Sequence, residues 1–158
     1  MSKEPSGSSD QKNQGIHEAS RREKMRKIEE MGIDPWGGRF DDRSYIGDVR
    51  ARCDEIHFLG ENGQVVELPA PDDDAWTNFR QWISDLGPGE LVGPRIRAAG
   101  RIVLQRKAGK LRFVDIQDWT GKIQLFIGKK QVGEEDFELA GQFDLGDFVG
   151  VDGQLRRT

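Results

Sequence analysis

The stretch Arg97-Ala-Ala-Gly-Arg-Ile-Val-Leu-Gln-Arg-Lys-Ala-Gly-Lys-Leu-Arg-Phe-Val-Asp-Ile-Gln-Asp-Trp-Thr-Gly-Lys-Ile-Gln-Leu-Phe-Ile127 has the pattern of three consecutive antiparallel strands. Gly109-Lys110 lies at the first hairpin turn and Asp118-Trp-Thr-Gly121 at the second, because glycine and aspartate accept the backbone conformations of tight turns. Beyond these strands, residues 133–142 predict a short helix and Asp144–Leu155 predicts a fourth strand.

This order of elements predicts the fold. A small barrel whose third and fourth strands are joined by a helix is the plan of an OB-fold, a Greek-key barrel of five strands. We therefore expect a mainly β fold with some helix, in which the OB-fold occupies residues 94–158. The sequence ends at Thr158 before a fifth strand, so the last strand of the barrel is expected to be missing.

The predicted strands carry an excess of positive charge. Between Pro94 and Lys130 there are ten lysines and arginines against two aspartates, a net charge of +8, whereas the whole chain carries −4. A basic surface on an otherwise acidic protein indicates an anionic partner, and nucleic acid is the first candidate. The alternative is a solvated hairpin with no partner. The candidate contacts to an RNA backbone are Arg101, Lys110, Arg112 and Lys122.

The composition excludes several classes of protein. The chain has 158 residues, of which 35% are hydrophobic and 33% charged, and Cys53 is its single cysteine. One cysteine and two histidines cannot form an internal disulfide or a metal cluster at the usual spacing, and neither a phosphate-binding loop nor a Ser-His-Asp arrangement is present. No apolar run has the length of a membrane span and no secretory signal begins the chain. We expect a cytoplasmic protein without metal-binding or catalytic residues in this chain.

The N-terminal third divides into two segments. Residues 1–15 are small and polar, which predicts a disordered tail. Residues 16–45 contain an expected helix over 16–31, with Gly32 as its C-terminal cap, followed by a turn.

An acidic insertion precedes the predicted barrel. Residues 46–93 carry a net charge of −7. Asn62-Gly63 predicts a hairpin turn, because this pair accepts positive φ, and Asp72–Leu86 has the periodicity of an amphipathic helix. This segment offers no candidate catalytic or ligand-binding residues.

Strand alternation places an aromatic ring and a carboxamide on one face. With Val114 and Ile116 toward the core, Phe113 lies on the opposite face, and Gln124 lies on the same outer face of the next strand. An unstacked base can lie on the Phe113 ring while Gln124, which both donates and accepts hydrogen bonds, contacts its edge. Arg106, near the end of the hairpin, can neutralise a phosphate or reach a second base. A register shifted by one residue would instead make Phe113 a core residue.

Short motifs occur in the order and spacing of a known family. They include Arg22-Glu-Lys-Met-Arg-Lys-Ile28, Gly32-Ile-Asp-Pro35, Ala99-Gly-Arg101, Gly109-Lys110, Gln117-Asp118, Gly121-Lys-Ile-Gln-Leu-Phe126 and Asp144-Leu-Gly-Asp147. With these motifs the chain resembles the N-terminal, anticodon-binding region of bacterial lysyl-tRNA synthetases, which are class II aminoacyl-tRNA synthetases. The resemblance covers most of residues 20–158 apart from the acidic insertion.

The resemblance implies a function. It implies an OB-fold that binds the U-rich anticodon of tRNA for lysine, within a homodimeric ligase that joins lysine to its tRNA using ATP and Mg²⁺. By position, Phe113 is similar to the stacking aromatic of the family, Gln124 to the residue that recognises the central uracil, and Arg106 to its basic partner. The catalytic domain of such an enzyme is expected to follow Thr158, so this chain alone is expected to be inactive.

Two alternatives stay open at the level of sequence. An aspartyl- or asparaginyl-type synthetase shares the strand pattern with Phe113 and Gln124, although Gly32-Ile-Asp-Pro35 and Asp144-Leu-Gly-Asp147 favour the lysyl type. The other alternative is a free-standing OB module that binds single-stranded nucleic acid and has no enzymatic role.

Overall fold

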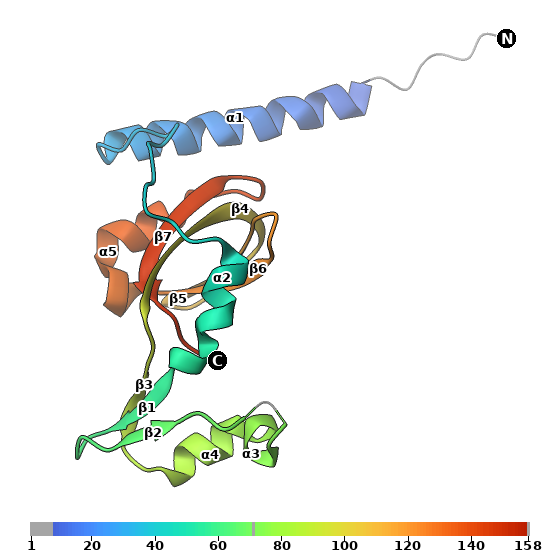
Figure 1. Cartoon of the computed structure of the whole chain (residues 1–158). Coiled ribbons are helices and arrows are strands. Elements are labelled where there is room, and N and C mark those ends of the chain that lie inside the picture. Colours follow the sequence, from blue (N-terminus) through green and yellow to red (C-terminus); the bar gives the residue numbers. More distant parts are fainter. Residues whose placement is uncertain (1–7, 71, 158) are drawn as a thin grey trace, which may run out of the picture. The chain divides into compact units, whose positions relative to one another are not determined.

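The computed structural model describes residues 8–70 and 72–157. The chain forms two compact units: residues up to 39 with 107–112 and 126–144, and residues from 40 to 106 with 113–125 and 145 onward. The helices described are α1 (Ser8–Glu30), α2 (Ile46–Ala51), α3 (Asp74–Thr77), α4 (Phe79–Asp85) and α5 (Lys129–Leu139), with a 3-10 turn η1 (Arg52–Glu55). The strands described are β1 (His57–Gly60), β2 (Val65–Glu67), β3 (Gly89–Val92), β4 (Arg95–Ala108), β5 (Leu111–Gln117), β6 (Lys122–Gly128) and β7 (Phe148–Gln154), as labelled in Figure 1.

The N-terminal helix begins earlier than the sequence pattern indicates. α1 starts at Ser8, so residues 8–15 of the predicted disordered tail are helical, while residues 1–7 lie outside the described part of the chain. The segment has no proline after Pro5, and Gly15 inside a helix costs only about 1 kcal/mol relative to alanine. Its composition therefore weakens a helix without stopping it.

The end of α1 is where the sequence predicts it. Gly32 adopts a φ of 75°, which a glycine accepts without strain. The amides of Gly32 and Ile33 donate to the carbonyls of Glu29 and Ile28 at 2.9 and 3.2 Å. This pair of hydrogen bonds is a Schellman motif, so the predicted glycine cap is confirmed.

The acidic insertion contains the predicted hairpin and one more strand. β1 and β2 pair in antiparallel register around a turn in which Gly63 has a φ of 81°. β3 then pairs with the other side of β1, which gives a three-stranded sheet in the order β2-β1-β3. Sequence analysis missed β3 for two reasons. Its partner strand β1 lies about 30 residues earlier in the chain, and its first residue, Gly89, is of a type that weakens the strand pattern.

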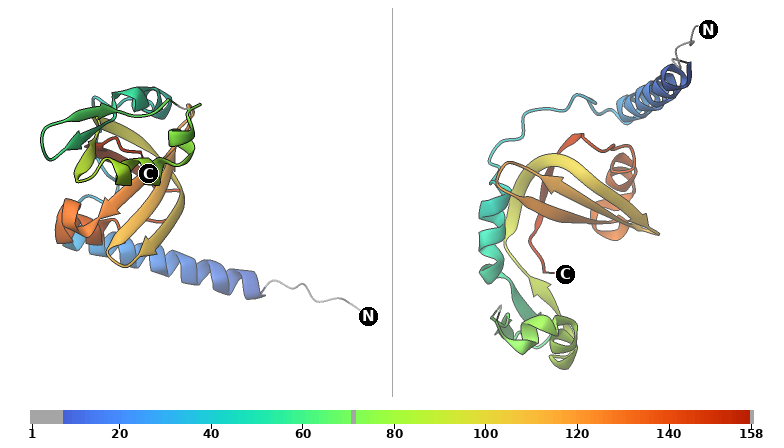
Figure 2. Two further views of the ribbon diagram at one scale, coloured as in Figure 1. Left: turned by 90° about the horizontal axis from the view of Figure 1, so that it is seen from below. Right: turned by 90° about the vertical axis from the view of Figure 1, so that its right-hand side faces the viewer.

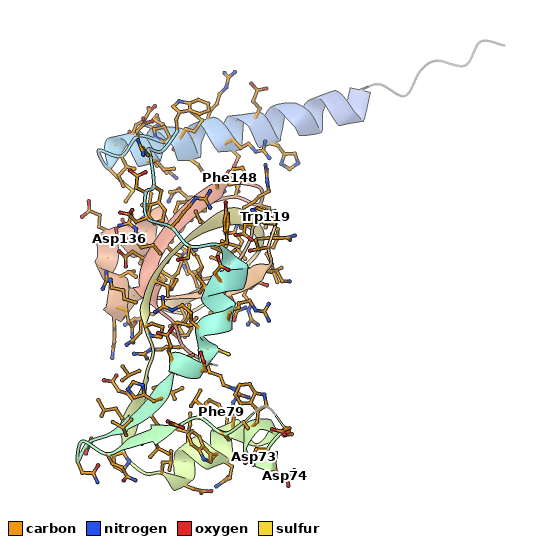
Figure 3. The ribbon with its side chains drawn as sticks, in the orientation of Figure 1. Asp73, Asp74, Phe79, Trp119, Asp136 and Phe148 are labelled. Carbon is orange, nitrogen blue, oxygen red and sulfur yellow. The ribbon has the colours of Figure 1, made fainter. Side chains whose placement is uncertain are left out.

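The single helix predicted over Asp72–Leu86 is two short helices. The Asp73 carboxylate accepts from the Ala75 amide at 2.8 Å and caps α3, and Figure 3 labels Asp73 at this helix start. Asn78, with ψ of 37°, interrupts the helix before α4 begins.

A curled antiparallel sheet confirms the expected OB architecture. Its strand order is β6-β5-β4-β7, and β4 curves strongly along its length (Figure 2). β4 and β7 pair from Arg95↔Gln154 to Arg101↔Phe148. β6 and β7 are the outer strands of this order, and α5 connects them along the chain.

The connecting helix differs from its predicted bounds for a local reason. α5 begins at Lys129, directly after β6, whereas the prediction began it at residue 133. Gly133 has a φ of 88° and a ψ of 178°, which lie outside the helical region, so the element consists of two helical pieces separated by this glycine. The predicted helix corresponds to the second piece.

The core of the second unit joins the insertion to the sheet. Its main cluster contains Val49, Ile56, Ile96, Ala98 and Leu155. These residues come from α2, from the segment before β1, from β4 and from the segment directly after β7, so burial of their apolar surface stabilises these elements together. None of the helices in the described part of the chain is long and apolar enough to cross a membrane.

Candidate nucleic-acid interface

The two faces of β5 are the ones that alternation predicts. Val114 and Ile116 are buried, with exposures of 1% and 0%. Phe113 is half-buried and lies on the other side of the strand, so the shifted register is excluded for β5. On β6, Lys122, Gln124 and Phe126 are exposed, while the alternate residues Ile123, Leu125 and Ile127 are half-buried.

Phe113 and Arg106 are in contact. The guanidinium carbon of Arg106, near the end of β4, lies 4.5 Å from the centroid of the Phe113 ring. A planar cation over an aromatic face is a cation–π interaction, worth about 0.5–1 kcal/mol at exposed sites. The structure thus brings together two of the three residues predicted for the base-binding pocket.

Gln124 is held by a carboxylate on the neighbouring strand. Its Nε2 donates to Oδ1 of Asp115 at 2.9 Å, and Lys122 Nζ lies 3.7 Å from Oδ2 of the same carboxylate. Asp115 is the next outward-facing residue after Phe113 on β5, so the ring and the carboxamide occupy adjacent positions of one surface. We call Arg106, Phe113, Asp115, Lys122 and Gln124 the β5–β6 face.

This surface suits a single-stranded nucleic acid. An aromatic ring offers a stacking platform, a carboxamide offers a donor and an acceptor for a base edge, and cations attract the phosphates. Among the described residues, no group of histidine, cysteine, aspartate or glutamate side chains could hold a metal ion.

Comparison with known proteins finds two similarities. Residues 96–158 match the family model described as the OB-fold nucleic acid binding domain. Over 143 residues the chain is 32% identical to lysine–tRNA ligase of Streptococcus gordonii and 33% identical to that of Streptococcus pyogenes serotype M49. Each alignment covers 87% of this chain and 22% of the relative, so the chain spans about a fifth of the length of these ligases.

Two of the residues predicted to contact the RNA backbone, Arg101 and Arg112, have side chains held by other parts of the chain. Arg101 stacks over Phe148 at 4.4 Å and donates to the carbonyl of Gly146 at 2.9 Å. Arg112 points to the opposite side of β5 from Phe113, where its guanidinium lies 4.8 Å from the Phe137 ring of α5. The structure does not bring either guanidinium to the β5–β6 face.

The other two residues predicted to contact the RNA backbone, Lys110 and Lys122, are exposed lysines. Lys122 belongs to the β5–β6 face and is more than half exposed. Lys110 is exposed at the turn between β4 and β5, next to Gly109 with its φ of 59°. A lysine at a hairpin end extends into solvent and can contact a phosphate.

The turn between β5 and β6 is built around Asp118. Its Oδ1 accepts from the amides of Thr120 and Gly121 at 2.7 and 3.0 Å and from the Thr120 hydroxyl at 2.6 Å. Its Oδ2 accepts from the amide of Ile46 at 2.9 Å, and the Thr120 hydroxyl accepts from Gly47 at 2.8 Å. The turn therefore caps the N-terminus of α2 and fixes where the insertion begins.

Sequence analysis gave Asp115 no function. A signal was present, because aspartate is depleted in strands and its presence in the middle of one is unusual. It also missed the exposed ring of Trp119, which packs edge-on against Tyr45 at 5.2 Å (Figure 3).

Basic residues of α1 are paired within their own unit. Arg22 contacts Glu18, Arg26 contacts Glu23 and Glu30, and Lys24 contacts Asp144. These ion pairs reduce the attraction of the helix for phosphates, so the β5–β6 face is the better candidate for RNA binding.

Proposed function

We propose that the OB domain binds the anticodon of tRNA for lysine through the β5–β6 face, as one part of a lysyl-tRNA synthetase. The observation that carries this proposal is the joint placement of Arg106, Phe113 and Gln124 on three adjacent strands, β4, β5 and β6, in a chain similar to lysine–tRNA ligases. The similarity favours this reading over a free-standing module, because it extends through 87% of the chain and is not limited to the barrel.

In this proposal one anticodon base stacks on Phe113. The Arg106 guanidinium now lies over that ring, so it moves aside or stacks on the base when RNA binds. Base–aromatic stacking is worth about 1–3 kcal/mol, which exceeds the cation–π contact that it replaces. Arg106 then neutralises a neighbouring phosphate.

Gln124 recognises the edge of the central uracil. Its carboxamide offers an oxygen acceptor and an N–H donor, and uracil presents the N3–H donor between two carbonyl oxygens. Lys110 and Lys122 contribute positive charge that attracts the RNA phosphates without distinguishing the base sequence.

The remaining functions of the ligase are proposed to lie outside these residues. Ligation of lysine to tRNA, with its use of ATP and Mg²⁺, would take place in the part of the enzyme that corresponds to the other four-fifths of the relatives. Homodimer formation and a cytoplasmic location belong to the same proposal. On this view the present chain supplies tRNA recognition alone and is inactive in lysine activation.

Fluorescence anisotropy with two anticodon stem-loops tests the proposal. One stem-loop carries UUU and the other UCU, and both are measured at one salt concentration. We expect tighter binding of UUU, and Gln124→Ala should remove most of this preference because it removes the groups that contact the base edge. Lys110→Ala is the matched control and should weaken both RNAs alike, as a phosphate contact does.

Equal binding of UUU and UCU by the unmodified chain would contradict anticodon recognition. A preference for UUU that survives Gln124→Ala would retain the function but reject the assignment of that residue.

A further inference from the structure

Asp115 places a negative charge on a surface proposed to bind RNA. Its side chain is only 12% exposed, and a carboxylate removed from water requires compensating partners. Gln124 Nε2 and Lys122 Nζ supply them at 2.9 and 3.7 Å. An alanine or threonine at this position would avoid the repulsion of phosphates, so the carboxylate needs a reason for its presence.

The contact with Asp115 fixes the orientation of the Gln124 amide. An ionised carboxylate only accepts hydrogen bonds, so the amide must turn its NH₂ group toward Oδ1. Rotating the amide by half a turn would bring Oε1, another acceptor, against Oδ1. Among the described residues Gln124 Oε1 accepts no side-chain hydrogen bond, and it is the amide group directed away from Asp115.

We propose that Asp115 is a positioning residue that locks the Gln124 amide so that Oε1 accepts the N3–H of uracil. The inference rests on the proposed function of this face. Cytosine has an unprotonated N3, which repels a fixed Oε1, whereas an amide free to rotate would turn its NH₂ group to that nitrogen and tolerate cytosine. Discrimination between the two pyrimidines therefore depends on Asp115, although Asp115 itself contacts neither base.

The variant Asp115→Ala tests the lock. It removes the acceptor while leaving Phe113, Gln124 and the lysines in place. The ratio of the dissociation constants for the UCU and UUU stem-loops should fall toward 1, by up to about tenfold, the factor that one discriminating hydrogen bond supplies. The decrease should come mainly from tighter binding of UCU, because the released amide adapts to cytosine and a negative charge is lost.

Asp152→Ala is the matched control. Asp152 lies on β7, where it pairs with Arg95 at 2.7 Å, so its removal changes the net charge and the side-chain size by the same amounts. We expect it to raise the affinity for both stem-loops and to leave the ratio unchanged.

A double variant separates positioning from a general structural effect. In the Gln124→Ala background, Asp115→Ala should have no further effect on the ratio, because the lock has no amide to hold. If Asp115→Ala does not fold, Asp115→Asn carries the test, since its amide both donates and accepts and no longer enforces one orientation of Gln124.

Each outcome decides the proposal. A preference for UUU that persists in both Asp115 variants, or an Asp115 effect that is unchanged in the Gln124→Ala background, overturns it while anticodon binding stands. If the unmodified chain binds the UUU and UCU stem-loops equally, the proposed anticodon recognition is rejected, and the positioning role of Asp115 is rejected with it.

Discussion

At the scale of single residues, the stacking ring is the most exacting test of the β5–β6 face. Phe113→Leu keeps an apolar side chain of similar packing but removes the aromatic surface, so we expect RNA affinity to fall by about 1–3 kcal/mol, the value of one stacked base. Titration by fluorescence anisotropy measures this change. Because stacking tolerates any base, UUU and UCU should weaken together.

Phe148→Leu is a matched control for that variant. Phe148 is also an aromatic ring covered by an arginine, with Arg101 at 4.4 Å, and 72% of it is exposed (Figure 3). It lies outside the β5–β6 face, so its loss should leave RNA affinity unchanged. An equal loss in both variants would mean that exposed aromatics contribute nonspecifically.

The placement of Phe113 and Gln124 on the outer face was predictable because strand alternation is a local property. Buried Val114 and Ile116 determine which side Phe113 occupies, and the sequence shows this pattern directly. The hydrogen bond between Asp115 and Gln124 was not predictable in the same way, because it depends on the registration of two strands and on the choice of side-chain rotamers. Strand alternation predicted the outer surface of β5 and β6, whereas the structure was needed to show that Asp115 orients the Gln124 amide.

At the scale of elements, Asp118 links a turn to a helix that the sequence does not reveal. We expect Asp118→Ala to lower the free energy of unfolding by about 2 kcal/mol, because a charged acceptor with several partners is lost and the amide of Ile46 remains uncapped. Thermal or urea unfolding measures the loss. Asp118→Asn keeps one oxygen and should cost less, while an unchanged midpoint in both variants would contradict the capping role.

The same carboxylate gives a pH dependence with a defined sign. Partial burial alone would raise the pKa of Asp118, but hydrogen bonds from the Thr120 hydroxyl and from the Ile46, Thr120 and Gly121 amides lower it. The folded chain therefore favours the ionised form. The stabilisation is complete above the unfolded pKa of about 3.9 and is lost as the pH falls through the lower folded value. Unfolding midpoints should thus decline more steeply on acidification in the unmodified chain than in Asp118→Asn.

The elements that escaped sequence analysis share a non-local cause. α2 has six residues and no side-chain cap of its own, because its capping groups come from Asp118 and Thr120, about 70 residues later. β3 depends on pairing with β1 in the same way. In contrast, the hairpin at Gly63 and the end of α1 at Gly32 were predicted correctly, because a glycine with positive φ acts within a few residues.

At the scale of the whole molecule, the acidic insertion and the last described residues meet at one arginine. The Arg157 guanidinium carbon lies 3.2 Å from the Trp76 ring centroid and 4.1 Å from that of Phe79, and Nη2 donates to the Trp76 carbonyl at 2.8 Å. Burial lowers the pKa of this guanidinium. The contact joins α3 and α4 to the segment after β7, within the second compact unit.

Arg157→Ala should loosen this junction without changing RNA recognition. Loss of a partly desolvated cation–π contact and its hydrogen bond is expected to lower local stability by about 2 kcal/mol, which raises amide hydrogen exchange in α3 and α4. Arg157→Lys keeps the charge but loses the planar stacking group. Its amide hydrogen exchange in α3 and α4 should therefore be closer to that of Arg157→Ala than to that of the unmodified chain. Exchange in β5 and β6, and the affinity for the UUU stem-loop, should stay unchanged because the Arg157 guanidinium contacts Trp76 and Phe79, which belong to the insertion. Faster exchange throughout the strands would instead show that the insertion supports the barrel, and its role would then extend to RNA binding.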